Sequence, residues 1–198
     1  MTNNNTDNEQ NFAIATQEQI RYDRMMVVLH WVLAIALIAQ WGLGNWMVDL
    51  PKEPPGYRAG WFNLHKSIGL VMGLVILWRM GWRLTHSIPA PLEATSQLQR
   101  LAARLTHGLL YVCMLAMPVS GFLSSSFSNY PVKFFGFALP RLFDPQPDLK
   151  SILAEVHESV AFVFAGLVAL HLLAVAWHVL VKRDGLLQRM KWGGQAVN

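Results

Sequence analysis

The stretch SVAFVFAGLVALHLLAVAWHVLV, residues 159–181, runs for 23 positions without a charged side chain. An α-helix rises about 1.5 Å per residue, so a run of this length crosses the roughly 30 Å hydrocarbon core of a bilayer. Residues 152–158 precede it without a Gly or a Pro and continue the helical pattern. The sequence therefore predicts a transmembrane helix over about 152–181.

Three other apolar blocks of similar length predict three more transmembrane helices, over about 25–47, 65–82 and 105–122. The chain is 53% hydrophobic and only 14% charged, which is too apolar for an ordinary water-soluble domain. The predicted fold class is all-α, an integral membrane four-helix bundle. We expect a polar N-terminal tail over 1–21, one transmembrane domain over 22–190 and a short C-terminal tail over 191–198.

The links between the predicted helices contain no second domain. They run over about 48–64, 83–104 and 123–155, and they hold most of the prolines. The last link contains KFFGFALPRLF, residues 133–143, whose mixture of aromatic and basic side chains is typical of a segment at the membrane interface.

Ten of the sixteen lysine and arginine residues lie on the side of the predicted bundle that also holds both chain ends. They are Arg21, Arg24, Arg79, Arg83, Arg100, Arg104, Lys182, Arg183, Arg189 and Lys191. The positive-inside rule places that side, and both termini, in the cytoplasm. Because these residues flank apolar blocks and form no single patch, they indicate topology rather than a nucleic-acid partner.

The histidines are concentrated in the predicted spans. Six of the seven lie in or at the edge of a span, and only His86 lies clearly in a loop. An ionisable side chain in hydrocarbon costs roughly a few kcal/mol unless it has a partner, so such residues mark functional sites by default. Each histidine alone is equally well explained as an interhelical hydrogen-bonding residue, but six together favour a cofactor site. The six are His30, His65, His107, His157, His171 and His178.

The spacing of His157 and His171 predicts two sites on one helix. At about 100° per residue their fourteen-residue separation returns to within ~40° of one face, and it spans ~21 Å along the axis. By depth, His65 at the start of the second span matches His157, and His30 in the first span matches His171 within several ångströms. Two bis-histidine sites at two depths favour haem iron held axially on both sides.

Other readings stay open from the residues alone. His107 and His178 enter the bundle at its cytoplasmic end, where they can replace His30 and His171 as ligands or hydrogen-bond a quinone or a haem propionate. Zinc is disfavoured, because the histidines spread over two depths with no intramembrane carboxylate and only Cys113 among cysteines. A haem-free proton channel or histidine transporter is the third reading, since histidine titrates near neutrality.

Several segments resemble the bacterial cytochrome b561 family, which is related to the b-type cytochrome subunits of nickel-iron hydrogenases and formate dehydrogenases. They are RYDRMMVVLHWVLA (21–34), NLHKSIG (63–69), WRMGWRLTHSIPAP (78–91), LTHGLLYVCMLAMPVSGF (105–122) and the stretch 156–190. The resemblance implies that His30 and His171 hold one haem b and that His65 and His157 hold the other. It also implies a non-ligand role for His107 and His178.

The resemblance further implies a di-haem cytochrome b of the bacterial inner membrane that passes electrons between a periplasmic-side or membrane donor and the quinone pool, with ubiquinone as the expected substrate. Some relatives oxidise superoxide, so a quinone-linked superoxide oxidase is one form of this prediction. The alternative function is a haem-bearing anchor subunit of a separately encoded dehydrogenase or hydrogenase. The expected protein partners are a redox partner protein or further copies of the chain in an oligomer. Lys66, Arg79 and Arg83 are candidates for propionate contacts, and otherwise for boundary charges or topology anchors.

Overall fold

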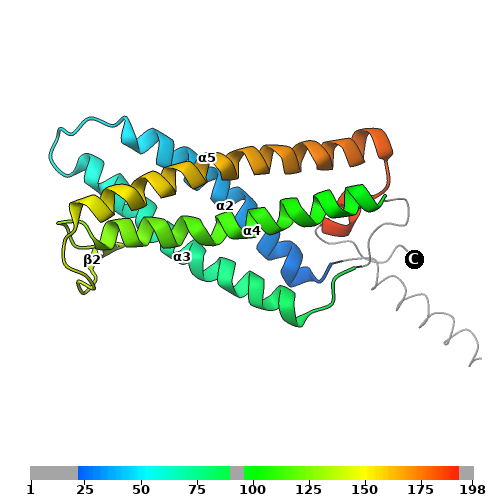
Figure 1. Ribbon diagram of the computed structural model, residues 1–198, viewed down its shortest axis with the longest axis horizontal. Helices are drawn as coiled ribbons and strands as arrows, with labels where there is room; N and C mark the ends of the chain where they lie inside the picture. Colours follow the sequence, from blue (N-terminus) through cyan, green and yellow to red (C-terminus); the bar gives the residue numbers. More distant parts are fainter. Residues whose placement is uncertain (1–21, 90–95, 192–198) are drawn as a thin grey trace, which may run out of the picture.

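Four long helices form the bundle that the sequence predicts (Figure 1). The structure, a computed structural model, describes residues 22–89 and 96–191. The helices are α2 (Arg24–Val48), α3 (Tyr57–Thr85), α4 (Gln97–Ser126) and α5 (Pro147–Trp177), and a π-helical turn η1 (His178–Lys182) continues α5. All four helices are long and apolar enough to cross a membrane. The prediction of an all-α membrane bundle is confirmed.

The helices extend beyond the predicted spans, so the links are shorter than expected. Hydropathy marks only the apolar centre of a helix, whereas its ends are set by local backbone chemistry. Gly56, with a positive φ of 87°, precedes α3, and Pro147 occupies the first turn of α5. At the start of α4 the Ser96 hydroxyl accepts the Gln99 backbone N–H, and the Gln99 side chain accepts the Ser96 N–H, a reciprocal capping box.

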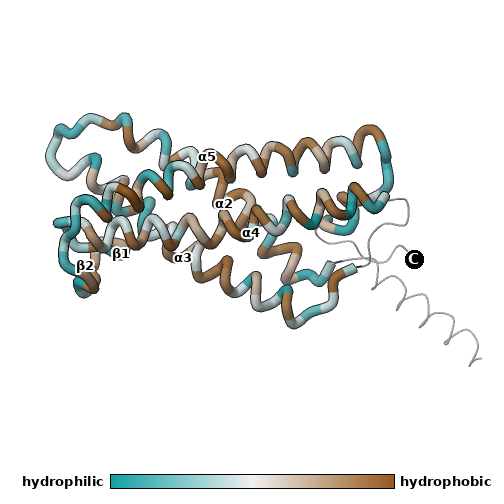
Figure 2. Tube along the Cα trace, viewed as in Figure 1, coloured by the Kyte–Doolittle hydropathy of each residue, from teal (hydrophilic) through white to brown (hydrophobic). Residues whose placement is uncertain are grey.

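The helices pack in the order α2, α3, α4, α5, and α4 and α5 run side by side along the molecule. Hydrophobic residues line the helices while polar residues gather at their ends (Figure 2). Many large apolar side chains lie on the outer surface, such as Leu74 (69% exposed) and Leu173 (68% exposed). Such exposure is unfavourable in water and natural in lipid, which agrees with a membrane-embedded bundle.

A small hairpin closes one end of the bundle. Strands β1 (Lys133–Phe134) and β2 (Phe137–Ala138) pair antiparallel in the segment predicted to lie at the interface. The fully buried Ser67 hydroxyl on α3 accepts the Phe135 N–H at 2.8 Å and donates to the Asn63 carbonyl at 2.7 Å. We call this end of the molecule the hairpin end, and the opposite end, which holds residues 178–191, the C-terminal end.

Helices α3 and α4 approach closely at Gly73. A Cβ added there would lie 3.2 Å from Cβ of Pro118, which is tighter than ordinary van der Waals contact. Small residues at helix crossings allow this approach in membranes, where packing rather than the hydrophobic effect drives association.

We predict that Gly73→Val destabilises the bundle by about 1–3 kcal/mol, because overpacking a close crossing forces the helices apart. The measurement is the apparent melting temperature of the protein in detergent, which should fall. Gly81→Val on the same helix is the matched control, because a Cβ at Gly81 meets no atom within 4 Å. Equal melting temperatures for the two variants would contradict the close crossing.

Candidate functional site

Helices α3 and α5 bring the rings of His65 and His157 together near the hairpin end. Their ring centres lie 6.3 Å apart and their planes make an angle of 84°. Glycines on the neighbouring helices leave room for both rings. A Cβ on Gly44 would lie 3.2 Å from His65 Cε1, and a Cβ on Gly121 would lie 3.0 Å from His157 Cε1.

The His157 ring is oriented by acceptors on α4. Its Nδ1 lies 3.0 Å from the Met117 carbonyl and 3.1 Å from the Ser120 hydroxyl oxygen. The hydroxyl itself donates to the Ala116 carbonyl at 2.6 Å, so it can only accept from the ring. Nδ1 therefore carries the proton, which leaves Nε2 with a free lone pair for a metal.

His65 is held mainly through its backbone. The Gln40 side-chain amide on α2 donates to the His65 carbonyl, which ties the two helices together at this level. Nδ1 of His65 is buried and has no hydrogen-bond partner among the described residues. The position of this ring therefore depends on packing and on the backbone contact rather than on a hydrogen bond at Nδ1.

Helices α2 and α5 bring His30 and His171 together toward the C-terminal end. Their ring centres are 6.4 Å apart, with an angle of 69° between the planes. His107 on α4 adds a third ring, 5.5 Å from that of His171. Trp31 packs edge-on against His30 at 5.4 Å.

Arg79 on α3 places a buried cation beside His30. Its side chain is only 7% exposed, and Nη1 donates to the Met26 carbonyl at 2.9 Å. Nη2 lies 3.4 Å from His30 Nδ1. Within the described residues no carboxylate lies within ion-pair distance of this guanidinium.

The spacing of both ring pairs fits a metal ion held between two imidazoles. Two metal–nitrogen bonds of about 2 Å, with roughly 1 Å from each nitrogen to its ring centre, separate the ring centres by about 6 Å. Each site thus offers two imidazole side chains from facing helices, and these residues would hold a b-type haem. The spacing of the four histidine rings and the glycines beside His65 and His157 fit that group.

Comparisons with known proteins agree with this chemistry. A family model described as prokaryotic cytochrome b561 matches residues 21–193, which is most of the chain. The chain belongs to the prokaryotic cytochrome b561 family. As a cytochrome b561 it is a membrane electron-transfer protein that binds b-type haem, and the predicted family is confirmed.

Three curated relatives extend the comparison. "Cytochrome b561 homolog 2" of Escherichia coli (strain K12) is 34% identical over 177 residues, covering 86% of this chain and 90% of the relative. "Cytochrome b561 homolog 1" of the same strain is 27% identical, covering 86% and 96%. "Probable superoxide oxidase CybB" of Yersinia pestis is 23% identical, covering 86% and 95%.

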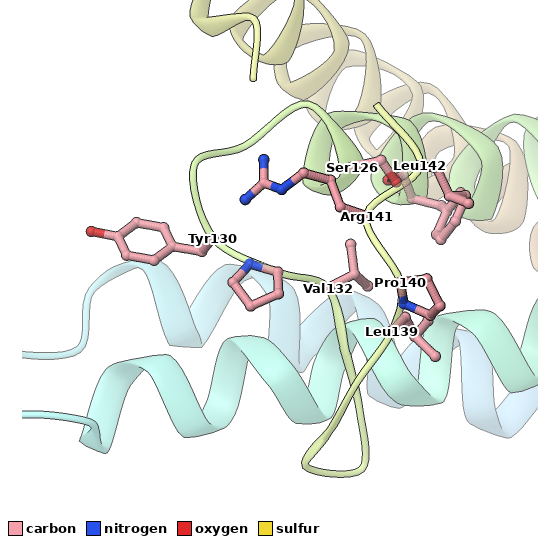
Figure 3. A pocket seen from close by; sticks show the side chains of 9 residues that line it. Ser126, Tyr130, Val132, Leu139, Pro140, Arg141 and Leu142 are labelled. Carbon is pink, nitrogen blue, oxygen red and sulfur yellow. The ribbon is translucent and has the colours of Figure 1, made fainter. Parts of the chain in front are cut away.

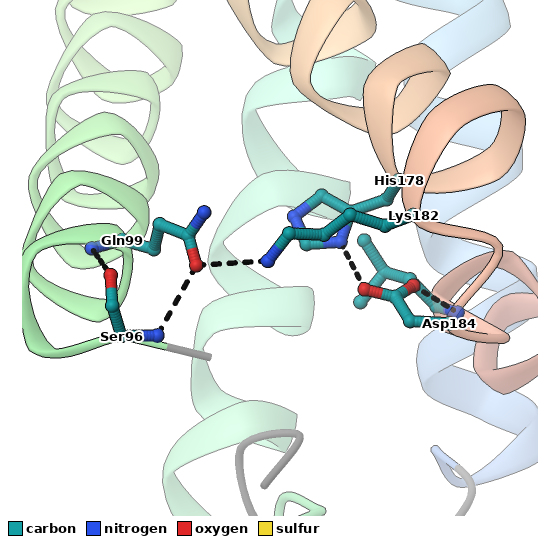
Figure 4. Close-up of polar contacts among 6 residues, drawn as sticks. Ser96, Gln99, His178, Lys182 and Asp184 are labelled. Atoms are coloured by element: carbon teal, nitrogen blue, oxygen red, sulfur yellow. Dashed lines mark hydrogen bonds and ion pairs between the residues drawn. The ribbon is translucent and has the colours of Figure 1, made fainter. Parts of the chain in front are cut away.

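The other predicted site residues of this cytochrome b561 have diverse surroundings. Lys66 follows His65 and is half-buried. Arg83 lies over the Tyr111 ring at 5.7 Å, one turn beyond Arg79. His107 is brought beside His171, whereas the ring of His178 pairs with Asp184 (Figure 4).

Residues 182–190 fold across the C-terminal end of the bundle, and we call this segment the strap. After η1, Arg183 and Gly185 adopt positive φ angles of 52° and 75°, and the chain turns back through η2 (Leu186–Met190). The Met190 carbonyl accepts the Trp31 indole N–H at 2.9 Å. At the α5 side, Lys182 Nζ donates to the Gln99 side-chain oxygen at 3.0 Å (Figure 4). The strap therefore links α2, α4 and α5.

Asp184 is the titratable group that anchors this strap. Slight burial raises the pKa of its carboxyl, but hydrogen bonds from the His178 ring and the Leu186 N–H, together with the Lys182 charge, hold that pKa below its usual value. The carboxylate therefore stays charged at neutral pH, where it orients His178.

A separate pocket of about 150 Å³ opens at the hairpin end between α4 and the loop that follows it (Figure 3). The labelled side chains of Tyr130, Val132, Leu139, Pro140 and Leu142 make it largely apolar. Arg141 lies at its edge and donates to the Ser128 and Asn129 carbonyls. No histidine lines the pocket, so it is distinct from the two ring pairs.

We predict that Gly121→Val lowers the amount of haem bound per chain, because the new side chain occupies the space of the His157 ring. The measurement is haem quantitation on detergent-purified protein. Gly108→Val, on the same helix, is the control, since a Cβ there meets nothing within 4 Å. Equal haem content in the two variants would show that Gly121 does not shape the ligand position.

Proposed function

We propose that this chain binds two haem b groups, one between His30 and His171 and one between His65 and His157. Its support is that the ring centres of the two pairs have nearly equal separations, 6.4 and 6.3 Å, at two levels of α5. The two α5 histidines are fourteen residues apart, or ~21 Å along the helix. The two sites would thus stand one above the other across the membrane.

The residues around these sites suit one-electron transfer rather than ligand binding. Each bound haem supplies an iron that changes oxidation state by one electron. With two histidines from the protein on each iron, the bound group would transfer electrons rather than bind an exogenous molecule. The contacts of His157 Nδ1 with Met117 and Ser120 fix the orientation of the His157 ring. A fixed ring would change position little when the iron gains or loses an electron.

We further propose that electrons enter at the hairpin end and leave to ubiquinone in the membrane, with superoxide as the donor. The distant similarity to a probable superoxide oxidase supports this donor. Two superoxide ions release two electrons and two molecules of dioxygen, and ubiquinone takes up two electrons and two protons to form ubiquinol. His107 and the His178–Asp184 pair are candidates for hydrogen bonds to the quinone at the C-terminal end.

The proposed orientation places the hairpin end in the periplasm and both termini in the cytoplasm of a bacterial cell. Its support is the excess of lysine and arginine near the C-terminal end of the bundle. At the hairpin end Lys66 is the candidate contact for a haem propionate or an incoming anion, because it is half-buried beside His65.

We predict two haem b per chain in the wild type, and a loss of one in both His65→Ala and His171→Ala. Each substitution removes one of the two histidines that would hold the haem, at a different site. A reduced-minus-oxidised spectrum with haem quantitation measures this. His86→Ala is the control, because this ring stacks on Trp82 at 4.0 Å, away from both pairs.

Two outcomes of this experiment would contradict the proposal. One haem in the wild type would mean that one ring pair binds none. The second contradicting outcome concerns the haem that His171→Ala loses. If His107→Ala also loses this haem and His30→Ala keeps it, then His107 rather than His30 is the partner of His171.

A further inference from the structure

The two ring pairs differ in the groups that face their Nδ1 atoms. At the hairpin end, the Nδ1–H of His157 is shared between the Met117 carbonyl at 3.0 Å and the Ser120 hydroxyl oxygen at 3.1 Å. Acceptors on this proton push electron density onto the ring and make it a stronger donor to iron. A stronger donor stabilises ferric over ferrous iron, so these two acceptors lower the reduction potential at this site.

At the other site the corresponding position faces a cation. When Nε2 of His30 ligates a metal, Nδ1 carries the proton, and Arg79 Nη2 at 3.4 Å is then a donor facing a donor. The guanidinium therefore acts on this site through its charge. A nearby positive charge disfavours the more positive ferric state, so Arg79 raises the reduction potential there.

The charge of Arg79 is poorly compensated and poorly screened. Its side chain is 7% exposed, and among the described residues its guanidinium donates to the neutral Met26 carbonyl, lies 3.4 Å from the His30 ring and has no carboxylate within ion-pair distance. Lys66 places a cation near His65 whose charge acts on that ring and opposes the difference, but Lys66 is more exposed than Arg79. Water and salt screen an exposed charge more strongly than a buried one.

Building on the two proposed haem sites, we infer that Arg79 and the Met117–Ser120 acceptor pair set the haem at His30/His171 to a higher reduction potential than the haem at His65/His157. Electrons then run downhill from the hairpin end to the C-terminal end. The ligand sets are chemically identical, two imidazoles each, so the difference comes from the surrounding residues. Residues on α3 and α4 thus set the direction of electron flow, whichever molecule donates the electrons.

The test is a spectrally resolved redox titration of the purified protein with its haems bound. The wild type is measured first, and His65→Ala, which retains only the second site, assigns the higher-potential wave. Arg79→Gln should lower that wave and reduce the equilibrium constant for electron transfer between the haems at least tenfold, which is about 59 mV for one electron. Arg79→Lys keeps the charge and should restore most of the shift, which separates charge from packing.

Ser120→Ala provides an independent variant at the other site. It removes one of the two acceptors on His157 Nδ1, so the lower-potential wave should move upward. Arg83→Gln is the matched control for Arg79, because it removes the same charge one turn further along α3, where the guanidinium lies over Tyr111. It should shift the higher wave less than Arg79→Gln does.

Specific results would overturn the inference. An unchanged higher wave in Arg79→Gln, or an equal shift in Arg83→Gln, would remove the special role of Arg79. If Arg79→Gln fails to bind haem, an unchanged or lowered wave in Ser120→Ala overturns the inference by itself. Failure of the underlying two-haem proposal is distinguishable, because the wild type would then lack two separate haem waves.

Discussion

A polar ring or a charge placed in hydrocarbon must find a partner within the protein. Five of the histidines and Arg79 lie inside the four membrane-spanning helices, where water cannot satisfy them. In the bundle, histidine rings from different helices face one another, and Arg79 donates a hydrogen bond to the Met26 carbonyl. The two ring pairs that result are spaced to hold a metal ion between them.

The supporting positions follow from the same constraint. Two facing rings need space, so glycines occupy the neighbouring helix positions at Gly44 and Gly121. The rings also need a fixed orientation, which Ser120 gives to His157, while Gln40 holds the backbone of His65. At the hairpin end, a hydrogen bond from the Phe135 N–H to the Ser67 hydroxyl holds the loop between α4 and α5 against α3, the helix that carries His65. Family membership and local structure thus point to the same electron-transfer chemistry.

Much of this architecture is readable from the sequence. Uncharged runs predict the four helices, and the fourteen-residue spacing on α5 predicts two levels of histidine. The starts of α3 and α4 were predicted too late in the chain, because hydropathy does not detect the capping residues Gly56 and Ser96. The partners of the rings were missed, since Gly121 and Ser120 become relevant only once α4 packs on α5. The pairing of the His178 ring with Asp184 was not predicted, because it depends on the π-helical turn and on the chain direction after it.

Electron paramagnetic resonance of the oxidised protein tests whether the chain holds two haems, each between two histidines with nearly perpendicular rings. Ring planes at 69° and 84° predict two highly anisotropic low-spin ferric signals, because perpendicular imidazoles leave the iron d orbitals nearly degenerate. A high-spin signal would mean that an axial histidine is missing. A single low-spin signal equivalent to one iron per chain would contradict the two-site arrangement.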